Sequence, residues 1–153
     1  MVIEYIENVM SKEDCDTLIS YLINSDQPAP ELTKNSLKRT KAKHHSIVLN
    51  IINKFNINCD RAFIMHYPKG VGSVWHVDNH SVENGDDIYY KWKTSSIIFL
   101  NDNFDGGELV YPDQDITIKP KTGMMVIAPA DDKFPHFVNP SSSDRYVLVT
   151  RNN

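Results

Sequence analysis

Cysteine is scarce in this chain of 153 residues, which contains only Cys15 and Cys59. The two cysteines are far apart and form no C-x-x-C spacing. Small secreted domains that depend on disulfides carry many more cysteines, and thiolate metal sites use closely spaced pairs. The composition therefore counts against a disulfide framework and against thiolate metal ligands. It favours a protein that works in a reducing compartment, which we expect to be the cytoplasm.

Long apolar runs, an excess of basic residues and internal repeats are also lacking. No apolar run approaches the roughly 20 residues that a membrane helix needs. The acidic Glu4 in a segment without basic residues does not fit a signal peptide. The formal net charge is −4 and the sequence pI is about 5.8, so no global positive field attracts a nucleic-acid backbone. These features count against membranes and nucleic acid as partners, and they give no indication of an oligomeric state.

Two helical patterns lie in the first third of the chain. Ser11 is an expected N-cap, and the acidic and then apolar residues after it predict a helix from residue 12 to about 24. The turn-forming residues 26–31 (DQPAPE) predict a loop. After a polar and basic stretch, residues 34–45, apolar residues recur at helical spacing and predict a second helix over roughly 43–55.

Short β-rich segments, separated by Gly, Pro, Asp and Asn, fill the rest of the chain. They are residues 61–67, 73–78, 94–101, 108–112, 115–120, 124–129, 136–139 and 145–151. Short strands at regular spacing favour a sandwich or barrel over a parallel sheet. We therefore predict a mainly β fold with N-terminal helices in a single domain, 1–153. Residues 1–60 are expected to form a helical support, and residues 61–153 a core of about eight strands.

The segment VWHVDNH places His76, Asp78 and His80 within five residues. Alternation along an extended strand would put these three side chains on one face. His76 and Asp78 need a third ligand to hold a transition metal, and His136 in KFPHFVNP is the best candidate. Two histidines and one carboxylate leave other coordination positions open, which is the facial triad of non-haem Fe(II) oxygenases. Nine residues later, Arg145 could hold a distal carboxylate through two hydrogen bonds.

Four motifs in fixed order carry a resemblance to a known family. They are YPKGVGSVWHVDN (67–79), TSSIIFLNDNFDGGELVYP (94–112), IKPKTGMMVIAP (118–129) and PHFVNPSSSDRY (135–146). With them, the stretch 62–150 resembles the catalytic core of 2-oxoglutarate/Fe(II)-dependent dioxygenases, specifically their prolyl 4-hydroxylase (prolyl-hydroxylase-domain-like) branch. The resemblance implies a double-stranded β-helix, a jelly-roll of eight strands similar to the cupin fold.

The resemblance also implies a role for individual residues. His76, Asp78 and His136 would bind Fe(II), and Arg145 would pair with the C5 carboxylate of 2-oxoglutarate. Tyr67 matches a tyrosine that lines the co-substrate pocket. The implied reaction uses O₂ to hydroxylate an unactivated C–H bond and is coupled to oxidative decarboxylation of 2-oxoglutarate to succinate and CO₂. Ascorbate is an optional further cofactor of such enzymes.

Three positions depart from the family pattern. Phe99 stands where many relatives have a tyrosine that hydrogen-bonds the co-substrate, and Ser73 stands where they have a second pocket tyrosine. Arg151 replaces a tryptophan late in the last strand. We treat these three residues and Asn79 as candidate pocket or substrate-binding residues. Residues 79–93, which are polar and rich in turn-forming residues, are a candidate substrate lid.

Other interpretations stay open at this point. His80 could contribute to a His-x-Asp-x-His zinc site, although the resemblance makes it a loop or pocket-rim residue. Arg145 and Arg151 in RYVLVTR resemble the final strand of AlkB-type nucleic-acid demethylases, which use the same iron and co-substrate. A non-catalytic barrel that binds a metal or a ligand is a third hypothesis. The leading hypothesis is a prolyl 4-hydroxylase-like enzyme, with a peptide, a protein or a small molecule as its substrate.

Overall fold

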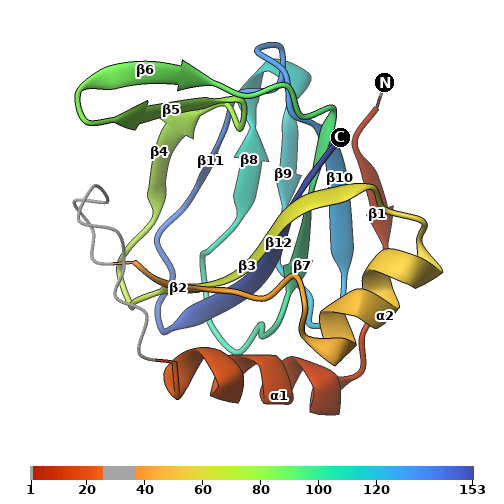
Figure 1. Ribbon diagram of the computed structural model, residues 1–153. Helices are drawn as coiled ribbons and strands as arrows, with labels where there is room; N and C mark the ends of the chain where they lie inside the picture. The colour runs from red at the N-terminus through yellow and green to blue at the C-terminus, as the bar shows by residue number, and fades with distance from the viewer. Residues whose placement is uncertain (1, 26–36) are drawn as a thin grey trace.

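The computed structural model describes residues 2–25 and 37–153, so the loop expected at residues 26–31 lies outside the described part. The fold is mainly β and is built from two antiparallel sheets, with helices along one side (Figure 1). The larger sheet has the order β1 (Glu4–Ile6), β10 (Met125–Pro129), β7 (Thr94–Phe99), β12 (Arg145–Asn152), β3 (Cys59–Tyr67) and β2 (Lys38–Lys41). The smaller sheet has the order β4 (Ser73–His76), β11 (His136–Val138), β8 (Leu109–Tyr111) and β9 (Ile116–Ile118).

A separate two-stranded hairpin, β5 (His80–Glu83) and β6 (Asp86–Tyr89), projects beyond the end of β4 (Figure 1). A short 3₁₀ helix, Pro112–Gln114, joins β8 to β9. Each of the eight β-rich segments contains one strand, and the prediction of a mainly β fold is confirmed. The strands β1, β2, β5 and β6 are additional. Two of them, β1 and β2, form the two edges of the larger sheet, so the N-terminal region contributes strands as well as helices.

Helix α1 (Lys12–Ile23) begins after Ser11, whose Oγ accepts a hydrogen bond from the backbone N–H of Asp14 at 3.2 Å. Helix α2 (Ser46–Lys54) begins three residues later than the spacing of apolar residues suggests. The reason is local, because Nδ1 of His45 accepts a hydrogen bond from the backbone N–H of Ile47 at 3.2 Å and caps the helix there. None of the helices in residues 2–25 and 37–153 is long and apolar enough to span a membrane.

Two apolar clusters lie on opposite faces of the larger sheet. The first packs the helices against the sheet, and its fully buried side chains include Leu18, Leu22 and Val48. Each such side chain contributes about 1.5–3 kcal/mol by leaving water. The second cluster fills the space between the two sheets. Strand alternation therefore sends every second residue of β12, beginning with Arg145, into the interior of the β-sandwich, where the site lies.

Candidate metal and 2-oxoglutarate site

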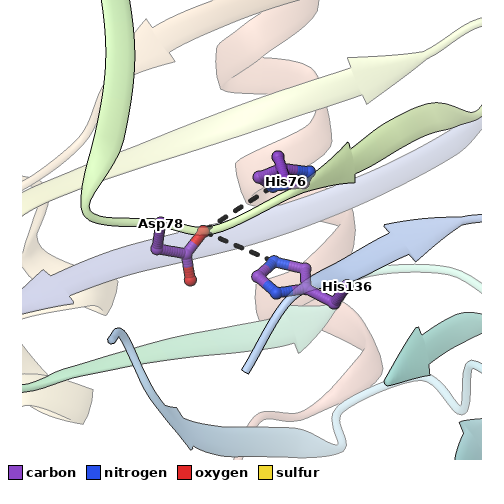
Figure 2. A group of neighbouring side chains, drawn as sticks. All are labelled: His76, Asp78 and His136. Atoms are coloured by element: carbon purple, nitrogen blue, oxygen red, sulfur yellow. Dashed lines mark ion pairs between the residues drawn. The ribbon is translucent and has the colours of Figure 1, made fainter. Parts of the chain in front are cut away.

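The three expected metal ligands lie together at one end of the smaller sheet (Figure 2). His76 is the last residue of β4 and His136 is the first residue of β11, and the two are direct partners in the antiparallel register. Asp78 lies on the turn that follows β4. One ligand atom from each residue lies within 4.8 Å of the other two. Among the described residues, this is the one group of three or more such side chains able to hold a metal.

The way Asp78 reaches the site differs from simple strand alternation. The strand ends at His76 and the chain turns at Asp78 and Asn79. The turn aims the carboxylate at both imidazoles, with Asp78 Oδ1 lying 3.7 Å from His76 Nε2 and 3.4 Å from His136 Nε2. The same turn directs His80 into the hairpin, where its Nε2 lies 2.9 Å from Oδ1 of Asp87. His80 is thus paired outside the group of three.

Each imidazole is held with its Nε2 atom toward the centre. His76 Nδ1 lies 2.8 Å from the carbonyl oxygen of Val74, and His136 Nδ1 lies 3.0 Å from that of Phe134. A carbonyl oxygen only accepts, so in both residues Nδ1 carries the proton and donates. The lone pair of a neutral imidazole is then on Nε2, as metal coordination requires. Burial, followed by the nearby His136, lowers the pKa of His76, which favours this neutral form.

Asp78 is a buried carboxylate with a cationic neighbour. Burial alone would raise its pKa, but the Arg151 guanidinium and His136 lower the pKa below its ordinary value. Nη2 of Arg151 lies 3.1 Å from Oδ1 of Asp78. Asp78 is therefore ionised, and two imidazoles with one carboxylate form a donor set that suits a divalent transition metal.

A cavity of about 120 Å³ extends from this group between the two sheets. Arg145 lies in its wall and is 1% exposed. None of its three guanidinium nitrogens has a hydrogen bond of normal geometry among the described residues. Burial lowers the pKa of Arg145, and the neighbouring Tyr67 offsets this only in part. The guanidinium lies over the rings of Tyr67 and Phe99, at 4.8 and 5.6 Å from their centroids. A buried cation without a partner is costly unless a ligand supplies the charge. The residues present therefore fit both a metal and an anionic co-substrate.

The remaining candidate residues lie in different surroundings. Oγ of Ser73 accepts a hydrogen bond from the backbone N–H of Val138 at 3.0 Å, so it joins β4 to β11. The side-chain amide of Asn79 donates to the carbonyl oxygen of Trp92 at 3.1 Å and accepts from its N–H at 3.2 Å, which closes the base of the hairpin. Neither of these two side chains lines the cavity, whereas Arg151 does.

Sequence reasoning missed Arg39, which lines the same cavity. It comes from β2, a strand hidden in the basic stretch 34–45. The one signal for that strand in the sequence is the alternation of the uncharged Thr40 and Ala42 with charged residues, and the structure buries these two. The short loop before β8 also supports the site. At Gly107, with φ of +71°, an added Cβ would lie 2.6 Å from a ring carbon of Phe104 and 3.2 Å from Cδ of Arg145.

The comparison with protein families identifies the class of protein. A model of the 2OG-Fe(II) oxygenase superfamily matches residues 62–150, which is more than half of the chain. The chain therefore belongs to this superfamily. The expected family is confirmed, and so are the expected enzyme class and co-substrates: the protein is a dioxygenase that depends on Fe(II), 2-oxoglutarate and O₂. No curated protein is similar enough in sequence to match the chain.

Solved structures share the fold at low sequence identity. A viral collagen prolyl hydroxylase from Paramecium Bursaria Chlorella virus-1, in its 2-oxoglutarate complex, matches with a TM-score of 0.78 and 18% identity over 99% of this chain and 94% of that one. A prolyl hydroxylase from Trichoplax adhaerens, in complex with a hypoxia-inducible-factor peptide fragment, gives 0.72 and 18% over 98% and 82%. A Pseudomonas putida prolyl-4-hydroxylase gives 0.69 and 17% over 99% and 92%. At these identities the likeness establishes the fold.

Proposed function

We propose that this protein is a prolyl 4-hydroxylase-like enzyme that hydroxylates a proline in a peptide or protein. The observation that carries the proposal is the unpaired guanidinium of Arg145, buried in the same cavity as the His76–Asp78–His136 group. An anion site and a metal site that share one small cavity suit a co-substrate with one carboxylate for each. The prolyl hydroxylases with the same fold support the choice of substrate class.

The residues divide the work between two ends of the cavity. His76, Asp78 and His136 would hold Fe(II), and Arg145 would hold the C5 carboxylate of 2-oxoglutarate. The bound iron, with its co-substrates, supplies the oxidising chemistry that inserts oxygen into a C–H bond and converts 2-oxoglutarate to succinate and CO₂. Tyr67 and Phe99 form the apolar walls around the anchor and exclude water from it. Phe99 has no hydroxyl group, so it contributes no hydrogen bond to the co-substrate.

Residues 79–93 are the proposed substrate lid. The β5–β6 hairpin follows β4 directly in the fold (Figure 1) and begins two residues after Asp78. Its Val82 and Tyr89 side chains are exposed. At its base, Tyr90 stacks on the buried Trp92 with ring centroids 4.2 Å apart. Replacing residues 81–88 with a short turn should abolish substrate-dependent turnover and leave metal binding intact. Loss of metal binding in that variant would instead show that the hairpin is structural.

An anaerobic titration tests the site. Fe(II) and then 2-oxoglutarate are added to the purified protein, and the visible charge-transfer absorption is recorded for the wild type, Asp78→Ala and Arg145→Ala. We expect a band in the wild type and a lost or weakened band in both variants. Asp87→Ala is the matched control, because this exposed carboxylate pairs with His80 alone among the described residues and should leave the band unchanged. A band that survives Asp78→Ala but disappears in Asp87→Ala would instead place the metal site at His80.

Turnover tests the substrate class. Proline-containing peptides are supplied with ascorbate in the buffer, succinate release is measured, and the product is examined for hydroxyproline by mass spectrometry. Succinate coupled to hydroxylation of proline supports the proposal. Coupled hydroxylation of another residue or of a free amino acid, with none of proline, would contradict it.

A further inference from the structure

A second and larger hollow lies along the outer edge of the bigger sheet, next to β2 and the start of α2. Its volume is about 1030 Å³, and most of its lining comes from residues 39–45 and 60–63, with Tyr21 of α1 added. Small-molecule sites occupy roughly 300–1,000 Å³. A hollow of this size therefore suits a segment of several residues better than a free amino acid.

The hollow lies next to the active-site cavity and shares two lining residues with it. Arg39 and Phe63 line both of them, and the guanidinium of Arg39 lies 5.4 Å from the centre of the Phe63 ring. The guanidinium of Arg151, which is paired with Asp78, lies 5.6 Å from the same ring centre. A chain lying in the hollow would therefore contact Arg39, which also lines the active-site cavity.

The lining is strongly basic, although the whole chain has a formal net charge of −4. It contains Arg39, Lys41, Lys43 and Arg61 and a single acidic residue, Asp60. Asp60 already accepts a hydrogen bond from the indole of Trp92 at 2.9 Å, and its carboxylate lies 3.7 Å from Nε of Arg61. Arg39 and Lys41 form no ion pair within residues 2–25 and 37–153. Burial lowers the pKa of Arg39, and the guanidinium groups of Arg151 and Arg61 lower it further, whereas Glu83 of the hairpin raises it only in part. The cations are therefore crowded together.

We propose that this hollow, which we call the basic groove, binds an acidic segment of the peptide substrate next to the residue that is hydroxylated. The inference rests on the proposed peptide hydroxylase function and adds a charge preference to it. Glutamate or aspartate side chains would pair with Arg39 and Lys41 and relieve the repulsion between the crowded cations. Complementary charges of this kind speed association and select among partners.

An acidic peptide fits the groove better than a nucleic acid does. Single-stranded nucleic acids bind through bases stacked on free aromatic faces. In the groove, Phe63 lies close to two guanidinium groups, those of Arg39 and Arg151. Tyr21 packs edge-on against His45 at 4.9 Å between ring centroids. The positive charges are therefore present without a row of free aromatic faces.

Binding to fluorescein-labelled peptides tests the inference without any need for turnover. Three peptides of equal length carry a central proline flanked by glutamate, glutamine or lysine, and fluorescence polarisation is measured with the Mn(II)- and 2-oxoglutarate-loaded protein. We expect the glutamate peptide to bind about tenfold more tightly than the glutamine peptide and to weaken with added salt. Lys41→Glu should reduce the ratio of the two affinities, glutamate peptide over glutamine peptide, by about fivefold. Lys119→Glu makes the same charge change at an exposed position outside the groove and should keep the preference.

The outcomes separate this inference from the proposed function. Equal binding of the glutamate and glutamine peptides would overturn the proposal that the basic groove binds an acidic segment. An equal effect of Lys41→Glu and Lys119→Glu would overturn it as well. Neither result would contradict prolyl hydroxylation. Tighter binding of a single-stranded oligonucleotide of equal charge, lost in Lys41→Glu, would also overturn it and would assign the groove to nucleic acid. Selective binding of the glutamate peptide without hydroxylation of any proline would support the groove and contradict the proposed reaction.

Discussion

Arg145→Met should make the ligand-free protein more stable while it destroys co-substrate binding. In the absence of a ligand, Arg145 is a fully buried cation whose three guanidinium nitrogens have no hydrogen-bond partner among the described residues. Burying an ion costs several kcal/mol, and replacing buried charged groups with apolar residues of similar volume often stabilises a protein by about 1–4 kcal/mol. Methionine fills the space beside Tyr67 and Phe99 without a charge. For a chain of this length, each kcal/mol corresponds to roughly 2–4 °C in the unfolding midpoint.

The same substitution should weaken 2-oxoglutarate binding strongly. Removing one partner of a buried charge pair costs about 2–5 kcal/mol, which corresponds to roughly 30- to 4,000-fold in affinity. Calorimetric titration of the Mn(II)-loaded protein measures the affinity, and urea denaturation without ligand measures the stability. Arg145→Lys separates the effect on stability from the effect on 2-oxoglutarate affinity. Lysine keeps the buried charge but loses the planar fork that binds a carboxylate through two hydrogen bonds.

Two results would refute this reasoning. If Arg145→Met lowers the stability of the ligand-free protein by several kcal/mol, the surrounding residues already stabilise the guanidinium, and it does not need an anionic ligand. If the variant binds 2-oxoglutarate with wild-type affinity, the C5 carboxylate has another partner. The opposite signs expected for stability and affinity make the pair of measurements more decisive than either one alone.

Gly107→Ala should lower stability by about 1–3 kcal/mol and weaken 2-oxoglutarate binding, because the added Cβ would press on Phe104 and on Arg145, the proposed anchor for the co-substrate. Gly85→Ala has a similarly positive φ with open space around it, so it should lower stability alone, and equal affinity losses in both would contradict the steric explanation. Burial raises the pKa of Cys15 to about 11, so the unfolded chain loses the thiol proton first and stability should fall as the pH rises above about 9. Cys15→Ala should remove about 2 kcal/mol of that fall in urea denaturation near pH 10.5, and identical pH profiles would refute the assignment. Asn79→Ala breaks two hydrogen bonds to Trp92 and should cost about 1–3 kcal/mol in thermal unfolding with Mn(II) affinity preserved, whereas loss of Mn(II) affinity would place its effect at the metal site.

Strand β12 was predicted from the sequence because it is apolar on both of its faces. In β12, inward residues such as Val147 line the cavity and alternate with outward residues such as Leu148, which pack under the helices. Such a strand is apolar enough on both faces to be recognised. The hairpin strands β5 and β6 are half-exposed and polar, so their composition resembles that of a loop. Their pairing depends on the tight turn at residues 84–85, where both residues have a positive φ.

The residues of the candidate site could be predicted from the sequence, but their geometry could be predicted only in part. The spacing of His76, Asp78 and His136 within ordered motifs is sufficient to identify the group. The ion pair between Arg151 and Asp78 was not visible in the sequence, because it depends on how far a long side chain of β12 reaches toward a turn in the other sheet. The contribution of Arg39 was hidden for a similar reason, since it requires β2 to pair with β3 at the edge of the larger sheet.

The two arginines of β12 differ in a way that bears directly on the co-substrate. Six residues separate Arg145 and Arg151, an even number, so both side chains point into the same cavity. Arg151 already has an anionic partner in Asp78, whereas Arg145 has none among the described residues. In the proposed function, an incoming dianion would find one uncompensated cation in the cavity, and this cation would select where the distal carboxylate lies. A shift of β12 by one residue would turn both guanidinium groups to the helix-covered face and remove the site altogether.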